Sequence, residues 1–262
     1  MTHRGFAKWL GSATLLLLAG TTMAQAQTIH FGVAAEPYPP FAVKQPDGQW
    51  QGFEIDLIKH LCTQMKADCA IDEVAWDGII PSLLAKKIDV IFASMSITDE
   101  RKKQIAFSVP YYNTPLVIAG LKGTDVTVNG QGLQGLKGKV IGVQISTVSA
   151  SYLKKYYEKS ADLRYYDTQD SANADLAAGR LDLIMADGTA VSDFLKTPDG
   201  KGLANLVTVP WDPLFGNGGV GAGLRPDDSE LKARLDTAIT ALLASPDYDK
   251  ISGKYFDISV KP

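Results

Sequence analysis

The sequence predicts an α/β protein built from two similar lobes. Strand-like and helix-like segments alternate from residue 28 onward, which is typical of mainly parallel sheets flanked by helices. The alternation stops in one long extended stretch at residues 108–121 and then starts again. We therefore expect two lobes of the same design rather than one long sheet.

An internal repeat supports the two-lobe prediction. LLAKKIDVIFAS (residues 83–94) and DLAAGRLDLIMAD (residues 175–187) each contain a helix end, a basic turn and a strand. The repeat aligns Ser94 with Asp187 at the ends of the two strands. Any buried parallel strand that follows a helix can produce this pattern, so the repeat alone is moderate support.

The N-terminal segment, residues 1–26, has the features of a cleaved signal peptide. Arg4 and Lys8 precede an apolar stretch that is too short to span a membrane, and the small-residue sequence AQA follows it. We therefore expect export to the periplasm as a soluble protein, since no cysteine at the cleavage point invites lipidation. Residues 27–262 carry 24 Lys and Arg against 29 Asp and Glu, which argues against non-specific binding to nucleic acid or anionic membranes.

In the first unit, residues 52–65 have the clearest helical pattern. Apolar residues recur at helical spacing at Phe53, Leu57, Leu61 and Met65. The polar residues that lie off this apolar face are Glu54, Lys59 and His60. The other elements expected in this unit are strands at residues 28–34, 70–75 and 88–93 and a helix at residues 77–87.

The second unit repeats the alternation before the chain returns to the first. We expect strands at residues 139–145, 163–167, 181–187 and 206–210, with helices at residues 146–159, 171–179 and 189–196. A strand at residues 218–225 and helices at residues 227–245 and 247–256 close the chain. Lobe 1 would comprise residues 27–114 and 211–262, and lobe 2 residues 115–210. Two crossings between lobes would form a hinge and leave a cleft.

The two cysteines, Cys62 and Cys69, stand close together in an exported chain, which favours a short-loop disulfide. Two free buried thiols would have the same spacing. A metal site would need further ligands, and His30 and His60 are the remaining histidines after residue 26. We therefore expect neither a metal nor a cofactor.

Polar residues follow the ends of several expected strands, where open α/β sheets bind their ligands. Ser94 and Ser96 offer hydroxyl groups, and Arg101 offers a planar guanidinium that matches a carboxylate. Thr147 stands at a helix start suited to the same anion, and Asp187 supplies the complementary negative charge. An α-amino acid, with its carboxylate beside its ammonium, would satisfy all of these groups.

A purely structural explanation of the same residues is also available. Thr98 can cap a short helix that contains Glu100 and Arg101, and serines and threonines before charged helices are often caps. Arg101 can equally be a solvated surface charge. From the residues alone, the ligand-binding explanation and the structural explanation are about equally supported.

Three segments resemble a known family: GFEIDLIKHL, IPSLLAKKIDVIFASMSITDERKKQIAFS and AAGRLDLIMAD. They are similar to extracytoplasmic amino-acid-binding proteins of ABC transporters, solute-binding protein family 3, in the branch for lysine/arginine/ornithine, histidine and the opines octopine and nopaline. The resemblance covers residues 28–257. It implies a type II periplasmic-binding-protein fold with a two-segment hinge, a monomer, ABC permease subunits as partners, and no enzymatic activity. Cys62 and Cys69 also match the disulfide of the basic-amino-acid binders.

The resemblance also implies roles for individual residues. The carboxylate anchor would be Arg101, supported by Ser96 and by Thr147 with the adjacent Val148 amide. The α-amino group would meet Asp187, Ser94 and the Ala93 region. The aromatic walls of the site would be Tyr38 and Trp76.

Two departures from the family pattern leave the ligand's identity open. Ser146, Thr147 and Val148 stand where the family often has Gly-Thr-Thr or Gly-Ser-Thr, so one hydroxyl donor is missing. Ala35 occupies the position of an aspartate that receives the cationic tail in the lysine/arginine/ornithine binders, and Glu36 lies beside it, as in opine-type relatives.

The expected ligand is cationic: arginine, lysine, ornithine, histidine or an arginine-derived opine. A carboxylate at Glu36, enclosed by aromatic walls, would favour a positive group that also stacks on the rings. In the alternative, Glu36 faces solvent, Trp76 is ordinary core, and a neutral or acidic amino acid binds. An exported dehydratase of the cyclohexadienyl type is a second alternative, for which Glu36 and Asp187 would be the obvious acid or base.

Overall fold

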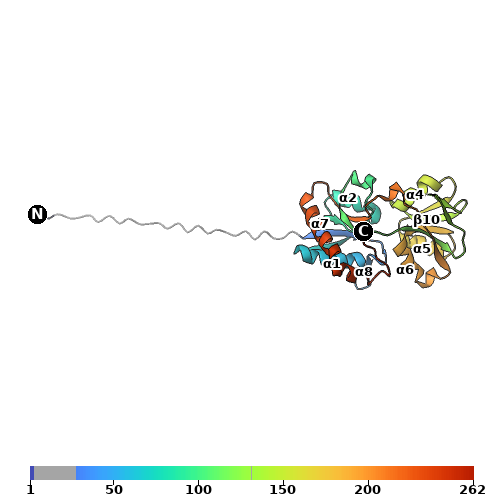
Figure 1. The fold of residues 1–262 in the computed structure, drawn as a ribbon. Helices are drawn as coiled ribbons and strands as arrows, with labels where there is room; N and C mark the ends of the chain where they lie inside the picture. Colours follow the sequence, from blue (N-terminus) through green and yellow to red (C-terminus); the bar gives the residue numbers. More distant parts are fainter. Residues whose placement is uncertain (3–27, 131) are drawn as a thin grey trace.

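The computed structural model describes residues 1–2, 28–130 and 132–262, which form two lobes (Figure 1). The expected signal peptide, residues 1–26, lies outside the described residues apart from its first two positions. Within the described part of the chain, no helix is both long enough and apolar enough to cross a membrane.

The first lobe contains a five-stranded sheet with the order β4-β1-β5-β14-β6. Its strands are β1 (Ile29–Ala34), β4 (Cys69–Val74), β5 (Val90–Ile91), β6 (Ala106–Tyr112) and β14 (Val220–Leu224). Its helices are α1 (Phe53–Met65), η1 (Trp76–Gly78), α2 (Ile79–Leu84), α3 (Asp99–Lys102), α7 (Ser229–Ala244) and α8 (Pro246–Ser252). A small hairpin joins β2 (Val43–Lys44) to β3 (Trp50–Gln51).

The second lobe contains a five-stranded sheet with the order β11-β10-β12-β7-β13. Its strands are β7 (Leu116–Leu121), β10 (Val140–Gln144), β11 (Asp162–Tyr166), β12 (Leu183–Asp187) and β13 (Leu203–Thr208). Its helices are α4 (Val148–Tyr157), α5 (Gln169–Ala177), α6 (Gly188–Leu195) and η2 (Pro198–Gly200). A second hairpin pairs β8 (Thr127–Asn129) with β9 (Gly132–Gln134), and η3 (Pro213–Phe215) lies on the return path to the first lobe.

The α/β alternation and the mainly parallel sheets are confirmed, since in each sheet four of the five strands run in the same direction and one strand runs against them. In the first sheet β1 pairs parallel with β4 and β5, whereas β14 pairs antiparallel with β5 and β6. The second sheet has the same arrangement, with β7 antiparallel to β12 and β13. The antiparallel strands flank the two crossings, because a chain that leaves and re-enters a lobe reverses direction there.

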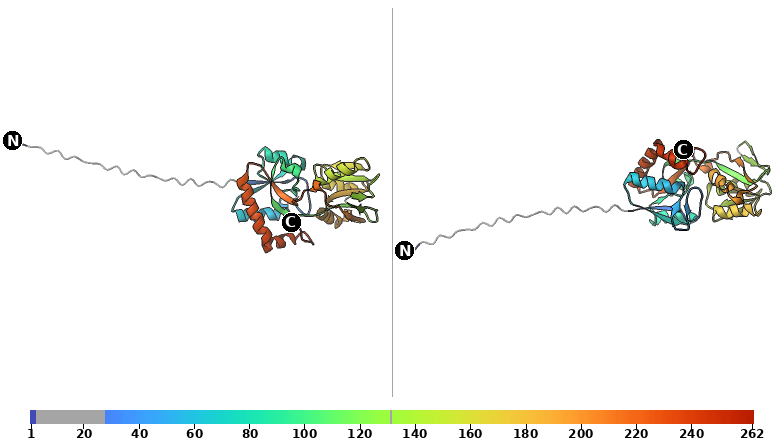
Figure 2. Two further views of the ribbon diagram at one scale, coloured as in Figure 1. Left: turned by 45° about the horizontal axis from the view of Figure 1, so that its top comes forward. Right: turned by 90° about the horizontal axis from the view of Figure 1, so that it is seen from below.

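The chain crosses between the lobes twice, after β6 and before β14, and the second crossing contains η3 (Figure 2). The C-terminal tail supports the first crossing, since the backbone N–H of Asn113 donates to the carbonyl oxygen of Val260 at 2.9 Å. On the other side of this crossing, the N–H of Gly188 donates to the carbonyl oxygen of Pro115 at 2.8 Å. The crossing is therefore tied to both lobes.

Helix α1 buries the apolar face that the sequence predicts, and each fully buried Leu or Phe side chain stabilises the fold by ~1.5–3 kcal/mol. Phe53 packs among Phe41, Tyr112 and Phe256 in an aromatic cluster. The disulfide between Cys62 and Cys69 is confirmed, with the two Cα atoms 6.3 Å apart. It fastens the last turn of α1 to the start of β4.

Candidate functional site

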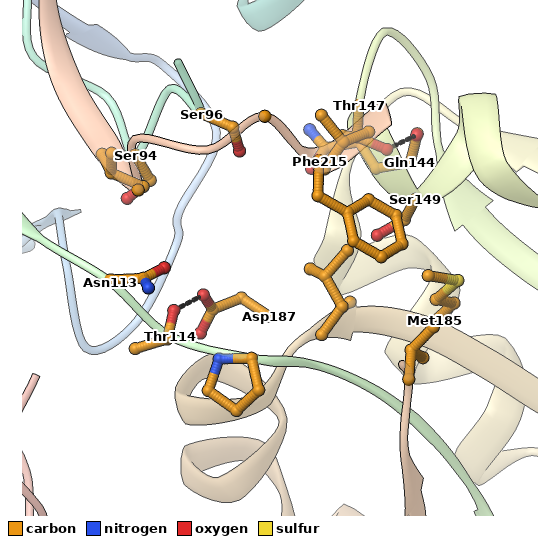
Figure 3. A pocket seen from close by; sticks show the side chains of 18 of the residues that line it. Ser94, Ser96, Asn113, Thr114, Gln144, Thr147, Ser149, Met185, Asp187 and Phe215 are labelled. Carbon is orange, nitrogen blue, oxygen red and sulfur yellow. Dashed lines mark hydrogen bonds between the residues drawn. The ribbon is translucent and has the colours of Figure 1, made fainter. Parts of the chain in front are cut away.

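A cavity of about 520 Å³ lies between the two lobes and is lined by residues from both (Figure 3). The carboxyl ends of β5 and β12 and the N-terminal ends of α3, α4 and α6 all contribute lining residues. A smaller cavity of about 60 Å³ adjoins it, because Tyr38, Trp76 and Ser94 line both. We call these the main cavity and the inner cavity.

All ten residues expected to bind ligand lie at these two cavities. Eight line the main cavity: Tyr38, Trp76, Ser94, Ser96, Arg101, Thr147, Val148 and Asp187. The other two, Glu36 and Ala93, line the inner cavity. The cavities thus gather in one place residues that are far apart in the sequence.

Arg101 reaches from the first lobe to the second. Thr98 caps α3 by accepting the backbone N–H of Arg101 at 3.2 Å, as the structural explanation predicts, and Arg101 also lines the main cavity. The guanidinium donates to the carbonyl oxygens of Ser96 at 2.9 Å and Ser146 at 3.0 Å, and it lies 5.5 Å from the Trp76 ring centre. Burial lowers the pKa of Arg101 to about 10, so it stays positive at neutral pH. A guanidinium has five N–H donors, so donors remain for a ligand.

Asp187 ends β12 and caps α6, a role that its sequence position did not reveal. Its Oδ1 accepts the backbone N–H of Thr189 at 2.8 Å and the Thr189 hydroxyl at 2.6 Å. Its Oδ2 accepts the hydroxyl of Thr114, which lies in the first crossing (Figure 3). Burial raises the pKa of Asp187, and these hydrogen bonds oppose that shift. The cap and the crossing therefore hold a carboxylate at the cavity wall.

The hydroxyl group of Ser94 already donates a hydrogen bond within the first lobe. Its Oγ donates to Oε2 of Glu54 at 3.1 Å, and its backbone N–H donates to Oε1 of the same residue at 2.7 Å. The backbone at Ser94 has a φ of 53°, a left-handed conformation that non-glycine residues rarely adopt. Strain of this kind is often found at functional sites.

Glu54 is the main residue that sequence reasoning missed, because helical periodicity placed it off the apolar face of α1. Its side chain is 1% exposed and lines the inner cavity. Tyr111 donates a third hydrogen bond to its carboxylate. Burial is the largest cause that raises the pKa of Glu54 to about 7, and its hydrogen bonds with Tyr111 and Ser94 limit the rise.

Three other residues that the sequence analysis expects to bind ligand are held by local hydrogen bonds. Thr147 caps α4, since its Oγ1 accepts the N–H of Ala150 at 3.1 Å and donates to the carbonyl oxygen of Gln144 at 2.8 Å. The backbone N–H of Trp76 donates to Glu36 at 3.1 Å, so Glu36 turns toward the inner cavity rather than only toward solvent. Trp76 also donates its indole N–H to the carbonyl oxygen of Ile145 at 3.0 Å, across the lobes.

Further lining residues carried no sequence motif. Those from the two crossings include Asn113, Thr114, Trp211, Phe215 and Asn217. The helix starts and strand ends of the second lobe add Gln144, Ser149, Gln169 and Met185. Their position depends on how the crossings fold back between the lobes, which short-range patterns do not report.

The charges around the two cavities are unbalanced. Among the described lining residues the carboxylates are Glu36, Glu54 and Asp187, and the sole cation is Arg101. In the described part of the chain, no group of three or more His, Cys, Asp or Glu side chains could hold a metal ion. The site as built suits an organic ligand that carries more positive than negative charge.

Comparisons with known proteins agree with this geometry. Residues 29–258 match the family described as bacterial extracellular solute-binding proteins, family 3. The L-arginine-binding protein of Pseudomonas aeruginosa is 39% identical over 253 residues, which cover 96% of each chain. The lysine/arginine/ornithine-binding periplasmic protein of Escherichia coli is 39% identical over 244 residues, which cover 92% of each chain. A Salmonella typhimurium periplasmic binding protein described by its high arginine specificity has a TM-score of 0.78 and 32% identity, covering 88% of this chain and 100% of the other.

Proposed function

Because the chain belongs to the bacterial extracellular solute-binding proteins, family 3, we propose that it captures a cationic amino acid or an arginine-derived opine. The ligand binds in the cleft and is delivered to the permease subunits of an ABC importer. The protein acts in the periplasm as a monomer and catalyses no reaction. The relatives, which are named as binding proteins, support this assignment.

One observation carries the proposal: Arg101 and Asp187 line the same cavity from opposite lobes. A carboxylate on the ligand meets the guanidinium, and an ammonium on the same carbon meets Asp187. The free N–H groups at the start of α4, beside Val148, add donors for the carboxylate. A ligand that bridges both charges holds the lobes together, so it prefers the closed form, as hinge closure requires.

The side chain of the ligand extends toward the inner cavity between Tyr38 and Trp76. The lining carboxylates Glu36, Glu54 and Asp187 outnumber the one lining cation, Arg101, which complements a ligand that carries net positive charge. Glu36 is fixed by the Trp76 N–H, so its carboxylate is oriented for a guanidinium or ammonium. The aromatic walls add cation–π attraction for the same group.

We propose lobe boundaries that agree with the membership of the two sheets. We assign residues 27–114 and 211–262 to lobe 1 and residues 115–210 to lobe 2. This division is supported by sheet membership, since β1, β4, β5, β6 and β14 form one sheet and β7 and β10–β13 form the other. The segments at residues 113–115 and 209–219 then serve as the hinge.

A thermal-shift panel of the standard amino acids, ornithine and the opines tests the proposed ligand class. A ligand present at about 100 times its Kd stabilises the folded protein by ~2.7 kcal/mol. For a chain of this size, that raises Tm by roughly 5–10 °C. We expect arginine or another cationic ligand to rank first. A first rank for glutamine or glutamate would contradict the cationic assignment.

A further inference from the structure

The hydroxyl group of Ser94 has its proton committed before any ligand arrives. Ser94 lines both cavities, and its Oγ donates to Glu54 Oε2 while its N–H donates to Glu54 Oε1. A hydroxyl group has one donor and two acceptor sites. With the donor used, Oγ can only accept a hydrogen bond from the cavity.

Glu54 is held so that this polarity is enforced. Its side chain is buried, and the Tyr111 hydroxyl is a further donor to Oε1. An ionised carboxylate accepts hydrogen bonds and donates none, so the hydrogen bond between Ser94 Oγ and Glu54 can only run from Ser94 to Glu54. The charged or titratable groups that act on Glu54 are Asp187, Tyr38, Tyr111 and Tyr112, and none of them is a cation.

Ser94 Oγ therefore presents an acceptor to the cavity. Asp187, on the opposite lobe, lines the same cavity and is also an acceptor. The backbone N–H and the hydroxyl group of Thr189 both donate to the Asp187 carboxylate. An ammonium group has three donors and no acceptor, so it suits the Ser94 and Asp187 acceptors. An α-hydroxyl group has one donor, so it cannot donate to both Ser94 Oγ and the Asp187 carboxylate.

We infer that Glu54 is a positioning residue that fixes Ser94 as an acceptor and thereby selects an α-amino acid over the corresponding α-hydroxy acid. This inference rests on the proposed function, in that the ligand is taken to be an amino acid. Glu54 acts through Ser94 and does not itself need to touch the ligand.

The test compares L-arginine with its α-hydroxy analogue by titration calorimetry at pH 8, where Glu54 is mostly ionised. In Glu54→Gln the amide oxygen still accepts the Ser94 N–H, but the amide NH₂ donates to Ser94 Oγ and frees the hydroxyl proton. We expect arginine to bind about tenfold more weakly, and the ratio of the two Kd values to narrow by about tenfold or more.

Two further variants distinguish an effect on the direction of the Ser94 hydrogen bond from a general loosening of the site. Ser94→Ala removes Oγ and should narrow the ratio as well, which decides the matter if Glu54→Gln does not fold. Tyr111→Phe removes the third donor to Glu54 but leaves both Ser94 bonds, so it should keep the wild-type ratio. An unchanged ratio in folded Glu54→Gln, or an equal narrowing in Tyr111→Phe, would overturn the inference. If Glu54→Gln does not fold, an unchanged ratio in Ser94→Ala would overturn it.

Failure of the proposed ligand class gives a different result. If wild-type protein binds glutamine and not arginine, the cationic assignment is wrong. The same ratio, measured with glutamine and its α-hydroxy analogue in the same variants, then supports or overturns the role of Glu54.

Discussion

Trp76 of the first lobe donates its indole N–H to the carbonyl oxygen of Ile145 in the second lobe, at 3.0 Å. The neighbouring residue of the same turn, Ser146, accepts a hydrogen bond from Arg101 at 3.0 Å. Ser146 has a φ of 58°, so this turn also contains left-handed backbone. Two residues of the proposed ligand site thus also hold the lobes together.

We expect Trp76→Phe to weaken binding of arginine by about two- to tenfold, because it removes one hydrogen bond between the lobes but keeps an aromatic wall. The loss should lie in a faster dissociation rate, since the closed form is less stable. Surface plasmon resonance measures both rates. Trp50→Phe, in the β2–β3 hairpin, is the matched control and should leave both rates unchanged. A slower association rate with unchanged dissociation would contradict the role between lobes.

Arg101→Ala should abolish useful binding while the protein stays folded. Removal of one partner from an enclosed charge pair costs ~2–5 kcal/mol, which is a loss of roughly thirty- to several-thousand-fold in affinity. Arg101→Lys should also bind poorly, because an ammonium lacks the planar fork. Titration calorimetry checks both, with Lys102→Ala as the control from the exposed side of α3. Near-normal binding by Arg101→Ala would show that Arg101 does not bind the carboxylate of the ligand.

The Cys62–Cys69 disulfide should contribute to stability and not to ligand contacts. Replacement of both cysteines by serine should lower the free energy of unfolding by ~2–3 kcal/mol, since the closed loop is short. Neither cysteine lines the main or the inner cavity, so arginine affinity should stay within about twofold of wild type. Urea denaturation and calorimetry on the same samples check the two statements. A large loss of affinity would show that the disulfide shapes the site.

Glu54 should make the ligand-free protein less stable as the pH rises from 4.5 to 7. Burial is the main reason that the pKa of this carboxyl is about 7 in the folded chain, against its ordinary value of 4.5. The folded chain therefore binds more protons than the unfolded chain in this window. The stabilisation is complete below pH 4.5 and is lost as pH rises through 7, up to roughly 3 kcal/mol.

Urea denaturation of wild type and Glu54→Gln at several pH values measures this contribution. The difference in free energy of unfolding, wild type minus variant, should fall across the window, because the neutral amide does not titrate. Other carboxylates cancel in the difference. A difference that is flat, or that rises with pH, would mean that Glu54 is ionised throughout.

The sequence predicts the charged anchors because the carboxyl ends of neighbouring strands converge in α/β sheets. This rule places Arg101, in the short helix after β5, and Asp187, at the end of β12, at the ligand-binding edges of their own sheets. The two edges face the same cavity because the two lobes pack with these edges toward each other. Hydrophobic alternation likewise predicts the strand and helix order. The direction of each strand is harder to predict from the sequence, because it depends on where the chain crosses between the lobes.

Glu54 could not be predicted because helical periodicity describes a helix by itself. In α1 it stands in the first turn, off the stripe formed by Phe53, Leu57 and Leu61. Its burial arises where that turn meets the Ser94 loop and β6, which are distant in sequence. Thr114 escaped prediction for the same reason, since only the folded crossing brings it to Asp187.

The proposed preference for a cationic side chain rests on Glu36. The carboxylate lines the inner cavity beside Tyr38 and Trp76 and accepts the backbone N–H of Trp76 at 3.1 Å. We expect Glu36→Gln to weaken arginine by about 10- to 100-fold, through loss of a charge-assisted contact of ~1.5–3 kcal/mol. Neutral amino acids should bind as before or better, because the amide needs no positive partner.

The substitution isolates charge, since the amide oxygen of Gln can still accept the Trp76 N–H and keep the aromatic wall in place. Glu73→Gln is the matched control: it removes a carboxylate from β4 that pairs with Lys44 at the surface and lines neither cavity. Calorimetric titration of all three proteins with arginine and glutamine gives the comparison. If Glu36→Gln leaves the arginine titration unchanged, then Glu36 serves only to orient Trp76, and the cation must be recognised by the aromatic walls alone.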